Sequence, residues 1–144
     1  MLSLVLTIIL VVSMIPPMEI SVSAAWNPYP TSQNVGGVET IPCTYYAWQQ
    51  AYDRLGVELP AWGNAINWYD AAAYAGYAVG AAPLENSIAV WSIDTHSYGH
   101  VAFVTGVSGS NMTINEGGRT DAAYNGGIVN NEVVPSTVGS YWYG

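Results

Sequence analysis

Apolar and aromatic residues in the first half of the chain recur at the spacing of an α-helix. One such pattern follows Pro42, a residue type favoured at the first helical position, and places Tyr45, Trp48 and Tyr52 on neighbouring turns. Gly56 is suited to end this helix as a C-cap. A helix is therefore predicted from Pro42 to the residue before Gly56.

A second helical pattern covers residues 64–76. Asn64 is a suitable N-cap and Gly76 a suitable terminator for it. The stretch before the first helix, residues 26–40, is rich in turn-forming residues and has no stable apolar period. It is therefore interpreted as a lead-in segment.

The pattern changes after Pro83, where short runs rich in β-branched and aromatic residues alternate with clusters of turn-forming residues. These runs are expected to form strands at residues 87–93, 100–107, 111–116, 127–134 and 140–144. Helices followed by strands favour an α+β domain, in which an antiparallel sheet packs on the helical half.

The N-terminal residues have the layout of a secretory signal peptide. An apolar run over residues 2–15 is followed by small residues at 23–25. The run is shorter than the roughly 20 apolar residues that cross a bilayer, so stable membrane insertion after leader removal is not expected. The expected organisation is a signal peptide at 1–25, a lead-in segment at 26–40 and one domain at 41–144.

The charge balance disfavours nucleic-acid binding. Ten acidic residues stand against two basic ones, Arg54 and Arg119, and the formal net charge is −8. Two cations cannot neutralise many phosphates, and no basic stripe could steer the protein to a polyanion.

Cys43 is the single cysteine, so an internal disulfide is impossible. In an oxidising compartment such a thiol is buried and inert, joined to another chain, or kept reactive. The position of Cys43 at a helix start favours the third interpretation, because unpaired backbone N–H groups and the helix dipole stabilise a thiolate there.

A reactive thiol needs a base and a third group that orients the base. His100 begins an alternating strand directly after a turn, and Glu116 closes the next strand. A hairpin turn through residues 108–111 would bring Glu116 beside His100. His96 lies inside a turn cluster and is interpreted as structural. Asp94, His96 and His100 offer three possible metal ligands, but no second cluster supports a closed site, so metal binding is disfavoured.

Four motifs in order resemble the CHAP domain, the cysteine, histidine-dependent amidohydrolase/peptidase module of bacterial and phage peptidoglycan hydrolases. They are CTYYAWQQAYDRLG, WGNAINWYDAAAYAG, SIAVWSID with YGHVAFVTGV, and TINEGG. The resemblance implies a papain-like α+β fold, no cofactor and a site that cleaves amide bonds in peptidoglycan. By position, Cys43 matches the family nucleophile, His100 its general base and Glu116 the residue that orients the histidine.

The sequence departs from the family at two positions near this site. Pro42 stands where a polar residue often precedes the cysteine, and it has no N–H. Oxyanion stabilisation would then depend on the Cys43 N–H and a donor that the sequence does not identify. Gly118 replaces a common asparagine, and Asn86 and Ser87 replace glycine and aspartate in the usual GDIAVW turn.

Three aromatic residues are candidates for substrate contact: Trp62, Trp91 and Tyr98. For the two tryptophans, packing in the core is the alternative interpretation, and Tyr98 also has the place of a turn residue.

The function expected from the resemblance is that of a secreted, cell-wall-associated thiol hydrolase acting on peptidoglycan, either as an N-acetylmuramoyl-L-alanine amidase or as an endopeptidase. Two alternatives stay open. One is a weakly active or inactive module that binds wall material or a partner. The other is an antibacterial effector with the same chemistry, for which an immunity or regulatory protein would be the partner.

Overall fold

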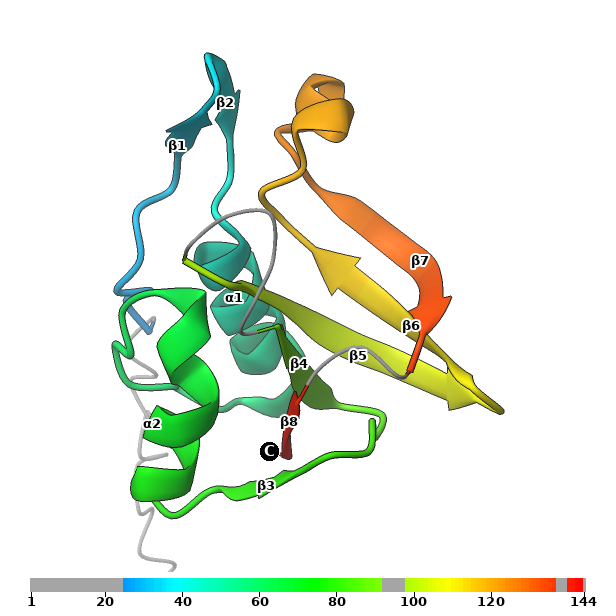
Figure 1. Ribbon diagram of the computed structural model, residues 1–144. Helices are drawn as coiled ribbons and strands as arrows, with labels where there is room; N and C mark the ends of the chain where they lie inside the picture. The colour runs from blue at the N-terminus through cyan, green and yellow to red at the C-terminus, as the bar shows by residue number, and fades with distance from the viewer. Residues whose placement is uncertain (1–24, 92–97, 137–139, 144) are drawn as a thin grey trace, which may run out of the picture.

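The computed structural model describes residues 25–91, 98–136 and 140–143, and these residues form an α+β domain (Figure 1). The helical elements are η1 (Ala65–Asn67), η2 (Thr120–Asn125), α1 (Cys43–Leu55) and α2 (Trp68–Tyr74). The strands are β1 (Gln33–Val35), β2 (Val38–Thr40), β3 (Ala78–Gly80), β4 (Ser87–Trp91), β5 (His100–Ser108), β6 (Asn111–Glu116), β7 (Val129–Pro135) and β8 (Ser140–Tyr143). The α+β fold class expected from the sequence is confirmed.

Six strands form one antiparallel sheet in the order β3-β8-β4-β5-β6-β7, and β1 pairs with β2 in a separate hairpin. The main core lies between the helices and one face of this sheet. Its largest side chains are Trp48 of α1, Trp68 of α2 and Phe103 of β5, all at most 2% exposed. A second apolar cluster, around Met112 and Ile114 of β6, is buried on the opposite face of the same sheet.

Helix α1 begins one residue later than the sequence predicts. Pro42 has φ −58° and ψ 145°, which is extended backbone, so it is the N-cap and Cys43 is the first helical residue. The fixed φ of proline suits either position, and the sequence alone does not distinguish them. The predicted end is confirmed, because Gly56 adopts the left-handed conformation with φ 68° and donates its N–H to Tyr52 O.

The second predicted helix, 64–76, is divided into two shorter elements. Asn64 precedes the 3₁₀ turn η1 rather than an α-helix, and α2 begins only at Trp68. Within η1 the Ile66 N–H donates to Tyr98 O over 2.9 Å, so this turn is held against the segment that leads into β5. Gly76 lies just beyond the C-cap of α2, with φ 86°.

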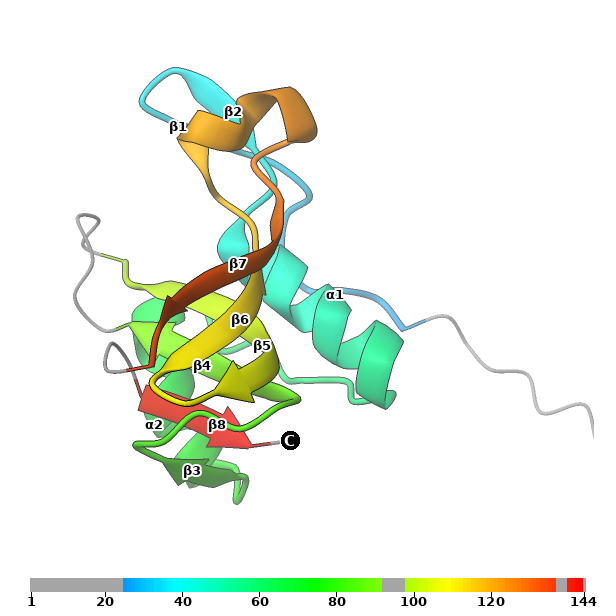
Figure 2. The same ribbon diagram turned by 90° about the vertical axis from the view of Figure 1, so that its right-hand side faces the viewer.

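The prediction of a lead-in segment was incomplete, because residues 26–40 contain the β1–β2 hairpin. Gly36 and Gly37 form its turn with φ of 60° and 88°, and Gly37 N–H donates to Asn34 Oδ1 over 2.9 Å. Strands of three residues give no measurable periodicity, which also explains why β3 was missed. Figures 1 and 2 both show this hairpin beside η2, at one end of the domain.

The predicted strands after Pro83 are found, with shifted ends. The hairpin of β5 and β6 matches the prediction, since Ser108 pairs with Asn111 across its turn. Strand β7 begins at Val129 rather than residue 127, and residues 92–93 and 144 of the predicted strands lie outside the described residues. The signal peptide predicted at 1–25 also lies outside them, except for Ala25. Within the described part of the chain, no helix is long and apolar enough to cross a membrane.

Candidate active site

A cleft of about 670 Å³ opens where the start of α1 meets the start of β5 and the end of β6. Its walls also include the β1–β2 hairpin, the residues before η1 and the start of η2. The lining residues are Gln33, Val35, Cys43, Thr44, Asn64, Ala65, Tyr98, Gly99, His100, Glu116, Gly118, Arg119, Thr120 and Asp121. All three residues predicted to form the catalytic site are therefore in one cleft.

Glycine lets the end of β6 approach the start of α1. A Cβ atom at Gly117 would lie 2.9 Å from Ile41 O, 3.0 Å from Pro42 O and 3.0 Å from Tyr46 Cβ. Real Cβ atoms rarely approach backbone so closely, so a side chain at residue 117 would push the two segments apart. The close approach brings Glu116 to the same cleft as the first residue of α1.

A second glycine positions the start of β5. Gly99 has φ 73°, and a Cβ atom there would lie 2.7 Å from both Ile66 N and Trp91 O. The turn before His100 therefore packs directly on the backbone of η1 and β4. This contact supports the sequence-based view that residues 98 and 99 shape the turn that delivers the histidine.

His100 and Glu116 are joined across neighbouring strands. The register places Phe103 opposite Asn115, and alternation of side chains then sets His100 and Glu116 on the same face. The Nε2–H of His100 donates to Glu116 Oε2 over 2.5 Å. The exposed fraction of the Glu116 side chain is only 4%, so its contact with the imidazole is shielded from water.

With Nε2 occupied by Glu116, the free ring nitrogen of His100 is Nδ1. The Cys43 thiol has no disulfide partner and lies near enough to the His100 ring to raise the pKa of the imidazole. Cys43, His100 and Glu116 thus lie close together in the cleft, with the imidazole bonded to the carboxylate and near the thiol. Trp91 pairs with His100 across β4 and β5. The centroids of its ring and the imidazole lie 5.4 Å apart, so Trp91 restricts the tilt of the imidazole.

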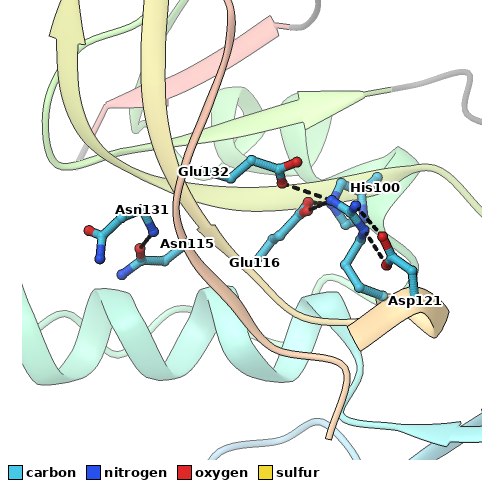
Figure 3. A network of polar contacts seen from close by, with 7 residues as sticks. His100, Asn115, Glu116, Asp121, Asn131 and Glu132 are labelled. Carbon is cyan, nitrogen blue, oxygen red and sulfur yellow. Dashed lines mark hydrogen bonds and ion pairs between the residues drawn. The ribbon is translucent and has the colours of Figure 1, made fainter. Parts of the chain in front are cut away.

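The second oxygen of Glu116 is held by Arg119. Figure 3 shows Glu116 with the other acidic residues of this network, Glu132 and Asp121. Arg119 Nη1 donates to Glu116 Oε1 over 2.5 Å and to Glu132 Oε2 over 2.7 Å. Its Nε and Nη2 donate to the two oxygens of Asp121 over 2.9 and 2.7 Å. A bidentate pair of this kind fixes the plane of the guanidinium, so Arg119 holds the buried carboxylate of Glu116 in one orientation.

These contacts shift the pKa values of the site in opposite directions. Burial lowers the pKa of His100, but hydrogen bonds to Cys43 and Glu116 and the negative charges of both raise it to about 10. Burial raises the pKa of Glu116, but hydrogen bonds with His100, Glu132 and Arg119 lower it to about 2. Near neutral pH the site therefore holds an imidazolium beside a carboxylate. The pKa of Glu132, in contrast, is raised by its hydrogen bond with Glu116.

The three aromatic residues predicted to contact substrate occupy different places. Tyr98 is 65% exposed and lines the cleft. Trp91 contacts the His100 ring instead of the cleft wall. Trp62 is not among the lining residues, and its ring packs edge-on against Trp68 and Tyr77, as the packing alternative expects.

The structure does not test the metal site weighed from the sequence, because Asp94 and His96 lie outside the described residues. Among the residues that are described, no group of three or more histidine, cysteine, aspartate and glutamate side chains is placed to hold a metal ion.

Sequence reasoning missed two parts of the site, Arg119 with its acidic partners and Gln33. Arg119 is one of two basic residues and stands three positions after Glu116, which was the available signal for an ion pair. Gln33 lies in the segment interpreted as a lead-in, and nothing in the local sequence marks it as a cleft residue.

Comparison with known proteins assigns this chain to a family. The family model described as CHAP domain matches residues 33–118. The Staphylococcal secretory antigen SsaA of Staphylococcus epidermidis is 35% identical over 124 residues, which are 84% of this chain and 41% of that protein. The secretory antigen ssaA2 of Staphylococcus aureus is 35% identical over 97 residues, which are 66% of this chain and 33% of that protein.

A crystal structure of an N-acetylmuramoyl-L-alanine amidase from Staphylococcus aureus is also similar. It superposes with a TM-score of 0.59 at 28% sequence identity, over 72% of this chain and 30% of that chain. The chain thus spans less than half the length of each of these relatives.

Proposed function

Because the chain belongs to the CHAP domain family, we propose that it is a secreted hydrolase that cleaves amide bonds of bacterial peptidoglycan with Cys43 as its nucleophile. The observation that carries this proposal is that Cys43, His100 and Glu116 line one open cleft, with His100 bonded to Glu116. A free thiol, a base near it and a carboxylate that orients the base are the parts that thiol-based amide hydrolysis requires.

The reaction follows from the positions of these groups. The Cys43 thiolate attacks the carbonyl carbon of the amide and forms a tetrahedral oxyanion. The His100 imidazolium then donates its Nδ1 proton to the amine as the carbon–nitrogen bond breaks, which leaves a thioester on Cys43. Neutral His100 next removes a proton from water, the water attacks the thioester, and the carboxylic acid is released with Cys43 restored.

Glu116 serves this cycle by holding the histidine. Its hydrogen bond to Nε2 keeps Nδ1 directed toward Cys43 and stabilises the positive charge of the imidazolium. Arg119 in turn fixes the other oxygen of Glu116, so the carboxylate does not rotate away when the histidine loses its proton.

The names of the relatives support the proposed substrate and location. The similar crystal structure is of an N-acetylmuramoyl-L-alanine amidase, and the two curated relatives are named secretory antigens. On that basis we propose that this chain is exported and that its substrate is an amide bond of the cell wall. Amidase and endopeptidase reactions would use the same three residues, so both bonds remain candidates.

The alternative of a module that binds wall material without cleaving it was motivated by departures from the family pattern. One of these departures, the presence of Asn86 and Ser87 in the turn before β4, fits the local backbone. Asn86 adopts φ 66°, a conformation open to asparagine and glycine, and Ser87 Oγ donates to Leu84 O over 2.6 Å. The altered turn therefore still leads into β4 with satisfied hydrogen bonds, and it gives no reason to expect an inactive site.

Digestion of purified peptidoglycan by the full chain tests the proposal. New amino groups and product masses should show release of whole stem peptides from the glycan by an amidase, or of cut stems and cross-bridges by an endopeptidase. A folded, reduced protein that releases nothing from walls of several cross-bridge types would contradict the proposal and favour the binding module.

A further inference from the structure

Attack by Cys43 on an amide places negative charge on the carbonyl oxygen, and this oxyanion needs hydrogen-bond donors beside the thiol. The Cys43 backbone N–H, at the open start of α1, is one donor. The residue before it is Pro42, which has no N–H and no polar side-chain atom. A second donor must therefore come from another part of the cleft.

The backbone of Gly118 lies beside the part of the cleft where such an oxygen could bind. A Cβ atom at this residue would lie 3.4 Å from Gln33 Nε2, 3.5 Å from Cys43 N and 3.6 Å from Cys43 Cβ. One small space, open because residue 118 has no side chain, is thus bordered by two nitrogen donors and the carbon that carries the thiol. Gly118 has φ 85°, so glycine also fits the backbone there.

Gln33 is held in this place by the β1–β2 hairpin. It pairs with Thr40 across the two strands, and its Nε2 donates to Thr40 Oγ1 over 3.4 Å. Thr40 is only 2% exposed, and the next residue, Ile41, donates its N–H to Gly126 O over 2.7 Å. The hairpin is therefore fixed to the body of the domain, and the second N–H of the amide is left for the cleft.

We propose that the side-chain amide of Gln33 and the backbone N–H of Cys43 together bind the oxyanion that forms when Cys43 attacks its substrate. This inference rests on the proposed function. Asn64 also offers an amide to the cleft, but the atoms that border the space at Gly118 are those of Gln33 and Cys43. Gln33 supplies the donor that the residue before the cysteine cannot supply in this chain.

The first test is the effect of Gln33→Ala on turnover of peptidoglycan fragments. Loss of one preorganised oxyanion donor lowers kcat by roughly 10²–10³-fold in other hydrolases, and the same range is expected here with KM little changed. Gln33→Met keeps the length of the side chain but has no donor, so it should show the same loss in kcat. It serves as the test if Gln33→Ala disturbs the hairpin. Glu39→Ala, on the exposed side of the same hairpin, is the matched control and should retain wild-type turnover.

The second test separates oxyanion binding from simple positioning of the thiol. A peptide aldehyde adds to Cys43 as a hemithioacetal whose oxygen occupies the oxyanion position, whereas iodoacetamide alkylates the sulfur and forms no oxyanion. Gln33→Met should bind the aldehyde roughly 10²-fold or more weakly and should be alkylated within about twofold of the wild-type rate.

The results of these two tests distinguish a failure of the role of Gln33 from a failure of the proposed function. Wild-type turnover or wild-type aldehyde affinity in Gln33→Met would overturn the role of Gln33. A matching loss in alkylation would also overturn it, because Gln33 would then act only on the placement of Cys43. If the wild-type protein neither cleaves peptidoglycan nor binds aldehydes, the proposed function itself is wrong.

Discussion

The imidazole of His100 and the carboxylate of Glu116 lie 2.5 Å apart on neighbouring strands, with the carboxylate almost fully buried. One oxygen of Glu116 serves the histidine, and the other serves Arg119. The orientation of the base is therefore set by a carboxylate that is itself held in place.

Replacing Glu116 by glutamine should impair catalysis far more than folding. The amide has the same shape but no charge, so it neither stabilises the imidazolium nor fixes the required tautomer. We expect a loss of roughly 10²–10⁴-fold in kcat and about 1–3 kcal/mol of stability. Glu132→Gln, which changes the other carboxylate on Arg119 Nη1, is the control and should lose less than tenfold. Equal losses in the two variants would contradict the assigned role of Glu116.

The pH dependence of kcat/KM should have an alkaline limb with an apparent pKa near 10. The pKa of His100 is raised to about 10, and the imidazolium is the group that donates a proton to the leaving amine. Glu116, with its pKa lowered to about 2, stays ionised throughout the working range and adds no acid limb above about pH 3. In Glu116→Gln the alkaline limb should move to lower pH, because one of the contacts that raise the pKa of His100 is removed. An unmoved limb would show that the histidine is not responsible for it.

The same histidine should make stability depend on pH. Its pKa is raised above the ordinary value of 6.5, so its contribution is fully present below about pH 6.5, declines as pH rises, and is lost above about pH 10. Thermal unfolding of the wild type and His100→Ala between pH 6 and 10.5 measures this contribution. The difference in Tm between the two proteins should narrow with rising pH. A constant difference would mean that the pKa of His100 is not raised in the folded state.

Gly117→Ala should disturb the site through the backbone. The added methyl group would meet Ile41 O and Pro42 O at about 3 Å, so the end of β6 must move away from the start of α1. A loss of about 1–3 kcal/mol in stability is expected, together with a fall in kcat, because Glu116 precedes the altered residue. Gly106→Ala in β5 is the matched control, since the nearest atom to its Cβ is 3.9 Å away. Similar stability and kcat in both variants would contradict the close-approach argument.

Activity on whole walls should rise with ionic strength. The chain has a formal net charge of −8, and anionic wall polymers would repel it at low salt. Turnover of purified walls should increase between 20 and 200 mM NaCl, whereas turnover of a short neutral fragment should change little. A fall in wall turnover with added salt would refute this electrostatic argument.

The sequence predicted the parts of this structure that depend on long or repeated local signals. Helix α1 shows an apolar period and a C-cap glycine, and the β5–β6 hairpin shows strand patterns on both sides of a turn, so the proximity of His100 and Glu116 followed. Gln33 could not be found in this way, because it reaches the cleft through a three-residue strand and contacts far along the chain. The role of Arg119 likewise depends on Glu132 and on a turn whose geometry its local sequence does not reveal.

The central claim is that Cys43 is the nucleophile, and the most direct test compares the wild type with Cys43→Ala on purified peptidoglycan. Cys43 is partly exposed and removing its sulfur should leave the fold intact, which thermal unfolding can verify. The release of new amino groups should fall by at least about 10⁴-fold in the variant, because it lacks the thiol that forms the acyl intermediate. Release by Cys43→Ala at a rate near that of the wild type would contradict the account.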